Sequence, residues 1–461
     1  MPSAVANGNG RANGGLRSIF ATMPAGSRLT QVGYSVVDQA LAVGGGFLVN
    51  VVLARTQSKE EYGMFALSYS VYLFLTSLHN AAILEPYTVY GSGRYRERFS
   101  EYLRLMARSN LVLGFLLTGI LLLICLALSW AAPQLMSRAL FGLALTVSVL
   151  LSGIFLRRAF YVQRQPALAA GSSLVFFLTV ACSLWLTTKA HRLDSFTVFL
   201  ILALGWIAAG AAFGRKLPFG KPAPPFVALE PQYWREHWKY SKWVLATAFL
   251  FQLTTQGYYW LVAGFLSTKD VAELRVIYLL VSPIEQALIA VSYLMVPALA
   301  AHYAANRMGS LLSLWKRFTL VAVGVTGLFA VAVWTVGKPV MHLLYEGKYD
   351  GLAAYLFVLA FLPMVLWIGN AMNHGLNAVE KPRFVFWAYL TSAAATFVGG
   401  IPLVMHFGLW GAVYGMVVSG VAFTMAVAVG FFFNVYVKAC RIVAPTLHLG
   451  PPPGPLAENK P

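Results

Sequence analysis

Charged residues are scarce in this sequence. Only 11% of its 461 residues are Asp, Glu, Lys or Arg, whereas soluble domains contain about 25%. Hydrophobic residues make up 59% of the chain. A soluble enzyme or a nucleic-acid-binding domain needs a charged, solvated surface, and a disordered chain is far less apolar. The composition therefore excludes these classes and argues against a nucleic-acid partner, in spite of the net charge of +18.

The chain also lacks the usual signs of catalytic or metal chemistry. Its three cysteines, Cys125, Cys182 and Cys440, lie in or beside apolar stretches without paired or CxxC spacing, so the sequence implies neither a disulfide framework nor a zinc site. Neither GxxxxGK[ST] nor HExxH occurs, and the eight histidines have no metal-ligand spacing. We therefore expect no catalytic residues, no metal and no cofactor.

Long apolar runs dominate what is present. A helix that crosses the hydrocarbon core needs about 20 mostly apolar residues. Twelve runs meet this requirement, at roughly 33–54, 62–84, 109–130, 139–162, 167–188, 194–213, 242–266, 274–299, 317–337, 352–373, 383–405 and 408–436. The sequence thus predicts an all-α polytopic membrane protein with about 12 transmembrane helices. Residues 1–30 lack the apolar core of a signal peptide and are interpreted as a flexible cytoplasmic tail.

The basic residues predict the orientation. Most of the 34 Lys and Arg residues fall in segments on the same side of the membrane as the N-terminus, and cytoplasmic loops carry the excess of positive charge. Both termini are therefore expected in the cytoplasm. The same charges attract anionic lipid headgroups, so membrane lipids are expected partners.

A long polar segment divides the chain into two halves. Residues 214–241 are proline-rich at first, then aromatic and basic, which is typical of a linker that ends in an amphipathic segment on the membrane surface. They separate six predicted spans in 31–213 from six in 242–436, and a second cytoplasmic tail follows at 437–461. Short motifs recur in both halves, at 58–61 and 268–270 and again at 164–166 and 380–382. We therefore expect two six-helix bundles related as parallel repeats.

Polar side chains gather on the first two spans of each half. They recur at helical spacing, so they form stripes along spans 1, 2, 7 and 8. Because polar groups in hydrocarbon turn toward a bundle interior or a watery cavity, we expect these stripes to line one central cavity. A tyrosine stripe is equally compatible with ordinary core packing. The candidate cavity residues are Asn50, Tyr69, Tyr72, Thr76, Asn80, Gln252, Thr255, Gln256 and Tyr259.

Two acidic residues lie well inside predicted spans. Asp38 in span 1 and Glu285 in span 8 are candidates for binding a proton or a cation, and His79 is a third candidate for proton transfer. The alternative for all three is hydrogen bonding that only packs the bundle. Gly44, Gly45 and Gly46 in span 1 and Pro283 in span 8 are candidate hinges. The glycines also suit close helix packing.

Three passages resemble motifs of one family of membrane proteins. Residues 55–67 (RTQSKEEYGMFAL) look like the "arxlgxxxfGxfal" passage of Wzx-type flippases for lipid-linked oligosaccharides, in the multidrug/oligosaccharidyl-lipid/polysaccharide (MOP) exporter superfamily. Residues 337–349 are similar to the "g-x-x-l-l-x-G-x-x-Y" turn of that family, and residues 377–382 resemble its "n-a-x-g-k-p" segment. With the span number and the division into halves, the resemblance covers roughly residues 31–436.

The resemblance implies a V-shaped pair of six-helix bundles that opens alternately to the two sides of the cytoplasmic (inner) membrane. The substrate would be a polyprenyl-diphosphate-linked oligosaccharide used for lipopolysaccharide or exopolysaccharide, and a polysaccharide polymerase or assembly protein would be a partner. Members of the family often hold the diphosphate with basic residues inside the cavity. Here the candidates lie near span ends, Arg55 and Arg275 outside and Arg157 and Arg158 inside.

The expected function is therefore flipping of lipid-linked oligosaccharide without enzymatic activity. A multidrug or cation antiporter of the same fold is the first alternative, because it would also use an acid in span 1 and an aromatic cavity. A membrane glycosyltransferase, polymerase or ligase is the second alternative, although its catalytic groups and large outer loop are missing from the sequence. For Arg157 and Arg158, anchoring of the span by the positive-inside rule is an alternative to phosphate binding.

Overall fold

A computed structural model describes residues 25–437 except 93, 94, 96, 97, 132, 133, 220–230 and 306. In this part of the chain every regular element is helical. Most of the two predicted tails, and the middle of the predicted linker, lie outside the described residues.

The first half begins with long helices that follow the apolar runs. Side-chain caps explain two of the starts, because Ser58 accepts a hydrogen bond from the Glu61 amide at 3.1 Å and Asp194 accepts one from the Thr197 amide at 2.7 Å. The elements are α2 (Ala25–Thr56), α3 (Lys59–His79), the π-helical turn η1 (Asn80–Leu84), α4 (Glu85–Ser92), α5 (Phe99–Ala131), α6 (Gln134–Val162), α7 (Pro166–Lys189), α8 (Ser195–Phe213) and the 3-10 turn η2 (Gly214–Lys216).

The second half contains more interrupted helices. Gly408 has a φ of 58° and a ψ of −134°, so the chain turns sharply inside α15. The elements are α9 (Pro231–Phe265), α10 (Thr268–Ala304), α11 (Met308–Tyr345), η3 (Asp350–Leu352), α12 (Ala353–Leu359), α13 (Leu362–Ala378), α14 (Pro382–Ala394), η4 (Ala395–Gly399), α15 (Gly400–Phe431) and η5 (Phe432–Tyr436).

The predicted all-helical membrane architecture is confirmed in its general form. Nine helical stretches of the described residues are long and apolar enough to cross a membrane. One of them, 383–436, has 54 residues and contains the turn at Gly408. The long helices α9 and α10 are not in this set, and both carry predicted polar stripes. The number of twelve spans and the orientation stay predictions.

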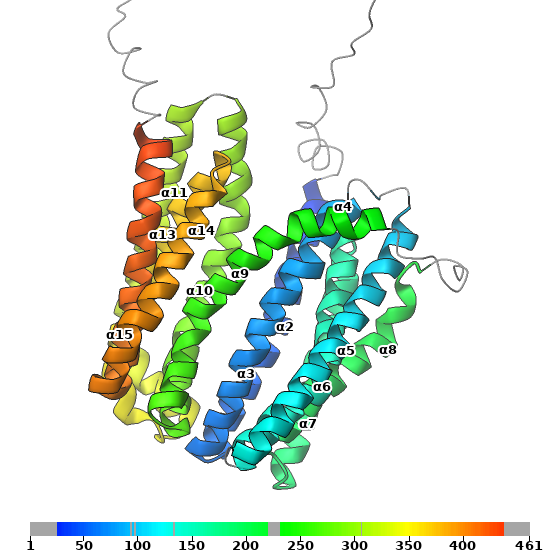
Figure 1. The fold of residues 1–461 in the computed structure, drawn as a ribbon, viewed down its shortest axis with the longest axis vertical. Helices are drawn as coiled ribbons and strands as arrows, with labels where there is room; N and C mark the ends of the chain where they lie inside the picture. Colours follow the sequence, from blue (N-terminus) through cyan, green and yellow to red (C-terminus); the bar gives the residue numbers. More distant parts are fainter. Residues whose placement is uncertain are drawn as a thin grey trace, which may run out of the picture.

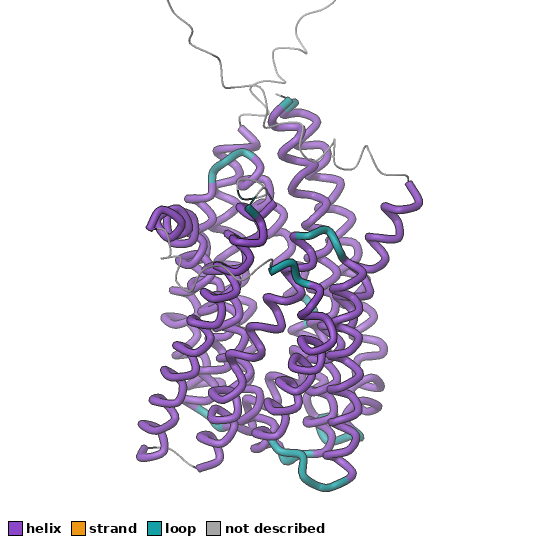
Figure 2. The backbone as a smooth tube through the Cα atoms, turned by 90° about the vertical axis from the view of Figure 1, so that its right-hand side faces the viewer, coloured by secondary structure: helices purple, strands orange, loops and turns teal. Residues whose placement is uncertain are grey.

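The helices are arranged in two groups with α9 running between them (Figure 1). In the first group α2 packs against α7, and α6 packs against α5 and α8. In the second group α15 packs against α13 and α14, and α10 packs against α13. Figure 2 shows the helices running side by side, with the loops gathered mainly near the two ends of the molecule.

Small residues let the helices of the first group approach closely. A Cβ atom at Gly153 on α6 would lie 2.1 Å from the ring of Trp206 on α8. The Trp206 ring also stacks on Phe176 of α7, with ring centroids 4.3 Å apart. This contact joins α6, α7 and α8 into one packed unit.

We predict that Gly153→Val destabilises the protein by about 1–3 kcal/mol, because the new side chain overlaps the Trp206 ring. Thermal unfolding of the purified protein in detergent, followed by circular dichroism, measures the effect. Gly119→Val on α5 is the matched control, since no atom lies within 4 Å of a Cβ at that position. Equal melting temperatures for the two variants would contradict the close packing.

Candidate functional site

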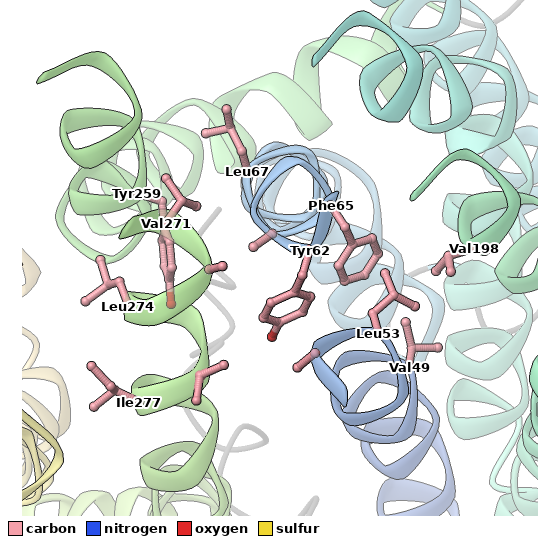
Figure 3. Close-up of a cluster of buried hydrophobic side chains, with 14 of the residues drawn as sticks. Val49, Leu53, Tyr62, Phe65, Leu67, Val198, Tyr259, Val271, Leu274 and Ile277 are labelled. Carbon is pink, nitrogen blue, oxygen red and sulfur yellow. The ribbon is translucent and has the colours of Figure 1, made fainter. Parts of the chain in front are cut away.

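The four helices that carry the predicted polar stripes lie together. Helix α3 packs against both α9 and α10, and α2 contacts α3 and α10. Figure 3 shows Tyr62 on α3 near α2, with Tyr259, Val271 and Ile277 of the second half opposite. These residues belong to one buried apolar cluster that continues across both halves. An open central cavity between the halves stays a prediction.

One end of this four-helix contact is closed very tightly. A Cβ at Gly63 of α3 would lie 1.8 Å from the carbonyl oxygen of Thr268 of α10, so only glycine fits there. Ser267 caps the start of α10 by accepting a hydrogen bond from the Asp270 amide at 3.3 Å, as Ser58 does for α3. The first turns of two similarly capped helices thus cross in contact. We call this region the closed end.

Reciprocal ion pairs join the two helices at the closed end. Lys59 of α3 lies 2.6 Å from Glu273 of α10, and Lys269 of α10 lies 2.9 Å from Glu60 of α3. Each helix therefore supplies one base and one acid to the other. These residues fall in or beside the short motifs that recur in both halves of the sequence.

The second half also contacts the end of α2. Arg55 forms an ion pair with Glu346, and its hydrogen bond lowers the pKa of that carboxyl group. The Lys348 ammonium donates hydrogen bonds to the carbonyl oxygens of Ala54, at 3.0 Å, and Gln57. These carbonyls end α2, where backbone oxygens lack helical partners. Arg55, a sequence candidate for diphosphate binding, is thus engaged in closing this end.

Arg275 is buried between the two halves. Its Nε donates a 3.0 Å hydrogen bond to Asn50 Oδ1 of α2, and its guanidinium lies over the rings of Tyr69 and Tyr259, 5.0 and 5.9 Å from their centroids. No carboxylate among the described residues forms an ion pair with it. The predicted span put Arg275 at an outer end, but α10 begins at Thr268, so Arg275 lies about 10 Å inside the helix.

Asn50 holds the position of that guanidinium. Its Nδ2 donates to the Gly46 carbonyl at 2.8 Å, which sets the amide orientation. The Oδ1 atom then accepts from Arg275 and, at 3.2 Å, from the Tyr62 hydroxyl of α3. Tyr62 is not among the residues predicted from the sequence. It lies seven residues, about two helical turns, before Tyr69 and therefore on the face of the predicted stripe.

Glu285 lies on α10 nearly three turns beyond Arg275. Its Oε2 accepts a 2.6 Å hydrogen bond from the Tyr278 hydroxyl. Its Oε1 is buried and has no hydrogen-bond partner among the described residues. This half-satisfied carboxyl group keeps Glu285 a candidate for binding a proton or cation.

Asp38 is not an isolated carboxyl group, and its contacts fit the packing alternative that the sequence left open. It is fully buried and bound by Arg157 of α6 through Nε at 3.1 Å and Nη2 at 2.6 Å. Tyr161 and Ser173 donate further hydrogen bonds to it, at 2.7 and 2.5 Å. All four residues belong to the first half. Arg157 therefore neutralises Asp38 and is engaged there, not presented to a phosphate group.

The predicted stripe on α3 separates into two parts. Tyr69 and Tyr72 are ring neighbours, with centroids 5.4 Å apart, and the Arg275 guanidinium lies over the Tyr69 ring. His79, one helical turn beyond Thr76, instead forms a 2.6 Å hydrogen bond with Asn110 of α5, within the first half. The π-helical turn that starts after His79 changes the direction of later side chains, which the regular helical spacing did not anticipate.

Asn80 and Arg158 form a separate polar cluster in the first half. Arg158 donates to Asn80 Oδ1 at 3.1 Å, and Asn80 Nδ2 donates to Glu85 at 3.0 Å. Asn80 is therefore held away from Tyr69 and Tyr72. On α9, Gln252 and Gln256 are buried, and Thr255 donates to Gln252 Oε1 at 3.2 Å.

The candidate hinges lie in unbroken helices. Helix α2 runs through Gly44, Gly45 and Gly46, and α10 runs through Pro283. A Cβ at Gly45 would lie 2.8 Å from the Phe176 ring of α7, so this glycine permits close helix packing. Bending at these positions stays a prediction. Among the described residues, no group of three His, Cys, Asp or Glu side chains is placed to hold a metal ion.

Comparison with known proteins identifies the fold. No family model and no curated protein matches the sequence. Among solved structures, an inward-facing multidrug resistance MATE family transporter of the MOP superfamily matches with a TM-score of 0.69 and 13% identity, over 89% of this chain and 99% of that one. The lipid II flippase MurJ, in an inward closed conformation, matches with 0.68 and 12%, over 91% and 94%.

A MOP superfamily transporter from Pyrococcus furiosus also matches, with a TM-score of 0.62 and 13% identity, over 89% of this chain and 94% of that one. At these identities the likeness concerns the fold. The chain therefore has the fold of the MOP superfamily transporters, as its sequence motifs predicted.

We predict that Gly63→Val opens the closed end, because any Cβ there overlaps the Thr268 carbonyl. Cysteines replace Arg192 and Lys338, which are exposed positions on opposite halves, in a variant without the native cysteines. Spin labels on these two cysteines report the distance between the halves by pulsed electron paramagnetic resonance. The distance distribution should shift to longer values. Gly119→Val is again the control, and an unshifted distribution for Gly63→Val would refute the assignment.

We also predict that Arg157→Gln destabilises the fold by about 3–5 kcal/mol, because it leaves the Asp38 charge buried without its partner. Asp38→Asn combined with Arg157→Gln should recover much of this loss, since no net charge then remains at the site. Chemical unfolding of the single and double variants in detergent gives the coupling energy. Additive effects would show that the pair does not hold the first half together.

Proposed function

We propose that this protein is a flippase that moves a polyprenyl-diphosphate-linked oligosaccharide across the cytoplasmic membrane by alternating access. The product would feed lipopolysaccharide or exopolysaccharide assembly, with a polymerase or assembly protein as partner. The fold supports a transporter, and the MurJ flippase among its structural neighbours shows that this fold can serve a lipid substrate. The Wzx-like sequence motifs favour an oligosaccharide-linked lipid.

The main support for this proposal is the environment of the buried Arg275 guanidinium. A buried guanidinium without a carboxylate is energetically unfavourable unless other groups compensate its charge. Here Asn50 and the faces of Tyr69 and Tyr259 compensate it partly. A diphosphate offers the guanidinium the strong, bidentate, charge-assisted hydrogen bonds that these neutral groups lack. Arg275 is thus the side chain that we assign to the anionic linkage of the substrate.

The neighbouring side chains suit a sugar. Tyr69 presents an aromatic face to Arg275 and Tyr72 lies beside Tyr69, and aromatic rings pack well against the apolar faces of sugar rings. The amides of Gln252 and Gln256 on α9 are donors and acceptors for sugar hydroxyl groups. These residues come from both halves, so a substrate between them would contact each half.

Alternating access requires the two halves to separate at the closed end. Its ion pairs join partly exposed side chains, and exposed ion pairs are weak. The two halves can therefore separate there without breaking a buried ion pair. Separation would also break the bond between Arg275 and Asn50, which joins the halves. Substrate binding at Arg275 is thereby coupled to opening. The division into two six-helix halves at residues 31–213 and 242–436 is part of this proposal.

A specific observation favours a second candidate function, a multidrug or cation antiporter. Glu285 has one buried carboxylate oxygen without a described partner, and an acid of this kind suits proton or cation exchange. The MATE transporters among the structural neighbours share the fold. Asp38 supports this candidate less, because Arg157 already neutralises it.

Transport by the purified protein in proteoliposomes tests the two candidates. For a fluorescent polyprenyl-diphosphate oligosaccharide, flipping is read from its protection against a membrane-impermeant quencher. We expect Arg275→Gln to slow flipping about tenfold or more, since it removes a charged hydrogen bond to the diphosphate. Arg275→Lys keeps the charge but not the bidentate geometry and should be intermediate.

Arg192→Gln is the matched control, because Arg192 is an exposed loop residue, and it should flip at the normal rate. The second candidate is correct if the wild-type protein exchanges an organic cation for protons and moves no diphosphate lipid. Glu285→Gln should then abolish the exchange.

A further inference from the structure

The first part of α9 forms an arm with an unusual exposed face. We define the arm as residues 234–243, at the end of α9 that lies opposite the closed end. Three large aromatic side chains on it are exposed, Trp234 at 43%, Trp238 at 62% and Trp243 at 66%. Figure 1 shows this part of α9 crossing beside α4 before the helix descends between the two groups. Three exposed indoles within ten residues suit a membrane–water interface, where tryptophan is enriched.

The opposite face of the arm is fixed to the first half. His237 is buried and shares a 2.8 Å hydrogen bond with Tyr102 of α5. Glu236 accepts a 2.7 Å hydrogen bond from Tyr95, and Ser241 donates to the Ala82 carbonyl at 3.4 Å. These contacts determine which side of the arm faces outward.

The outward face is basic as well as aromatic. Arg235, Lys239 and Lys242 are exposed beside the indoles, and none of them has a carboxylate partner among the described residues. Glu236 is the only acid in 234–243 and is held by the contact with Tyr95. At 100° per residue, the three basic residues and the three tryptophans share one half of the helix circumference. The face thus combines apolar rings with uncompensated positive charge.

The length of α9 allows this face to lie at the membrane surface. With 35 residues the helix is about 52 Å long, whereas the hydrocarbon core is about 30 Å thick. The other end of α9 meets the closed end, so an α9 that crosses the bilayer from that end leaves its excess length at the arm. Indoles favour the headgroup region, because the ring is largely apolar while its N–H needs a hydrogen-bond partner.

We propose that the arm is a binding site for the headgroups of anionic phospholipids in the adjacent leaflet. Arg235, Lys239 and Lys242 bind the phosphate groups, and the three indoles insert between the lipids at headgroup depth. Each basic side chain near such a surface adds to the attraction. Because the other face is fixed to the first half, bound lipid holds the start of α9 against that half. This site is independent of the substrate proposed above.

Quenching of indole fluorescence by brominated lipids tests the proposal with the full-length protein in nanodiscs. Two discs have the same mixture of phosphatidylcholine and phosphatidylglycerol. Bromine is on the phosphatidylglycerol in one disc and on an equal mole fraction of phosphatidylcholine in the other. The difference between wild type and Trp238→Phe isolates the signal of Trp238. We expect brominated phosphatidylglycerol to quench it about threefold more strongly, because the basic residues enrich that lipid.

Charge variants test whether the lipid preference comes from the basic residues of the arm and not from the positive charge of the whole protein. A neutral triple variant should be quenched equally by the two lipids at Trp238; it carries Arg235→Gln, Lys239→Gln and Lys242→Gln. A triple variant that keeps the charges should still be quenched more strongly by brominated phosphatidylglycerol; it carries Arg235→Lys, Lys239→Arg and Lys242→Arg. The matched control removes exposed basic residues elsewhere, through Arg138→Gln, Arg192→Gln and Lys338→Gln, and should also keep the preference. Equal quenching in the wild type, or an unchanged preference in the first variant, would overturn the proposal.

Discussion

The contact between Arg275 and Asn50 is the interaction on which the rest of the site depends. It places a full positive charge between the two halves, where an amide oxygen and the faces of two tyrosine rings lie against it and no carboxylate of the described residues forms an ion pair with it. Such a group is stable only where its surroundings are well ordered, because a misplaced partner leaves the charge unsolvated. The bond from Asn50 to the backbone of α2 supplies that order. The same arrangement leaves the guanidinium able to take a stronger, anionic partner.

Asp38 and Arg157 show the opposite solution to the same physical problem. There the buried charge has a partner of opposite sign in a bidentate geometry, and two hydroxyl groups complete its hydrogen bonds. The pair lies wholly within the first half, so motion between the halves does not disturb it. One buried charge thus has a partner of opposite sign within the first half, whereas Arg275 lies between the two halves without an ion-pair partner among the described residues. This contrast separates a structural role from a candidate binding role more clearly than residue type does.

The closed end combines close backbone packing with weak electrostatics. Gly63 lets the backbones of α3 and α10 touch, and the reciprocal ion pairs align the first turns of both helices. Partly exposed ion pairs fix the alignment of the two helices but stabilise their contact only slightly. An interface of this composition can reopen, whereas the tightly packed contact of Gly153 with Trp206 inside the first half is suited to remain closed.

The sequence by itself determined the helical membrane architecture, the fold family through its motifs, and the helices that carry the polar residues. Apolar run length and helical spacing are local properties, and both are set by the thickness and chemistry of the bilayer. Only the tertiary structure decided which charges are paired. Asp38 is 119 residues from Arg157, and Asn50 is 225 residues from Arg275. Such pairs depend on how the helices rotate and approach, which side-chain packing over the whole bundle decides. The π-helical turn after His79 and the early start of α10 at Thr268 changed that rotation and depth. For this reason the sequence could name candidate residues but not the partners that each of them contacts.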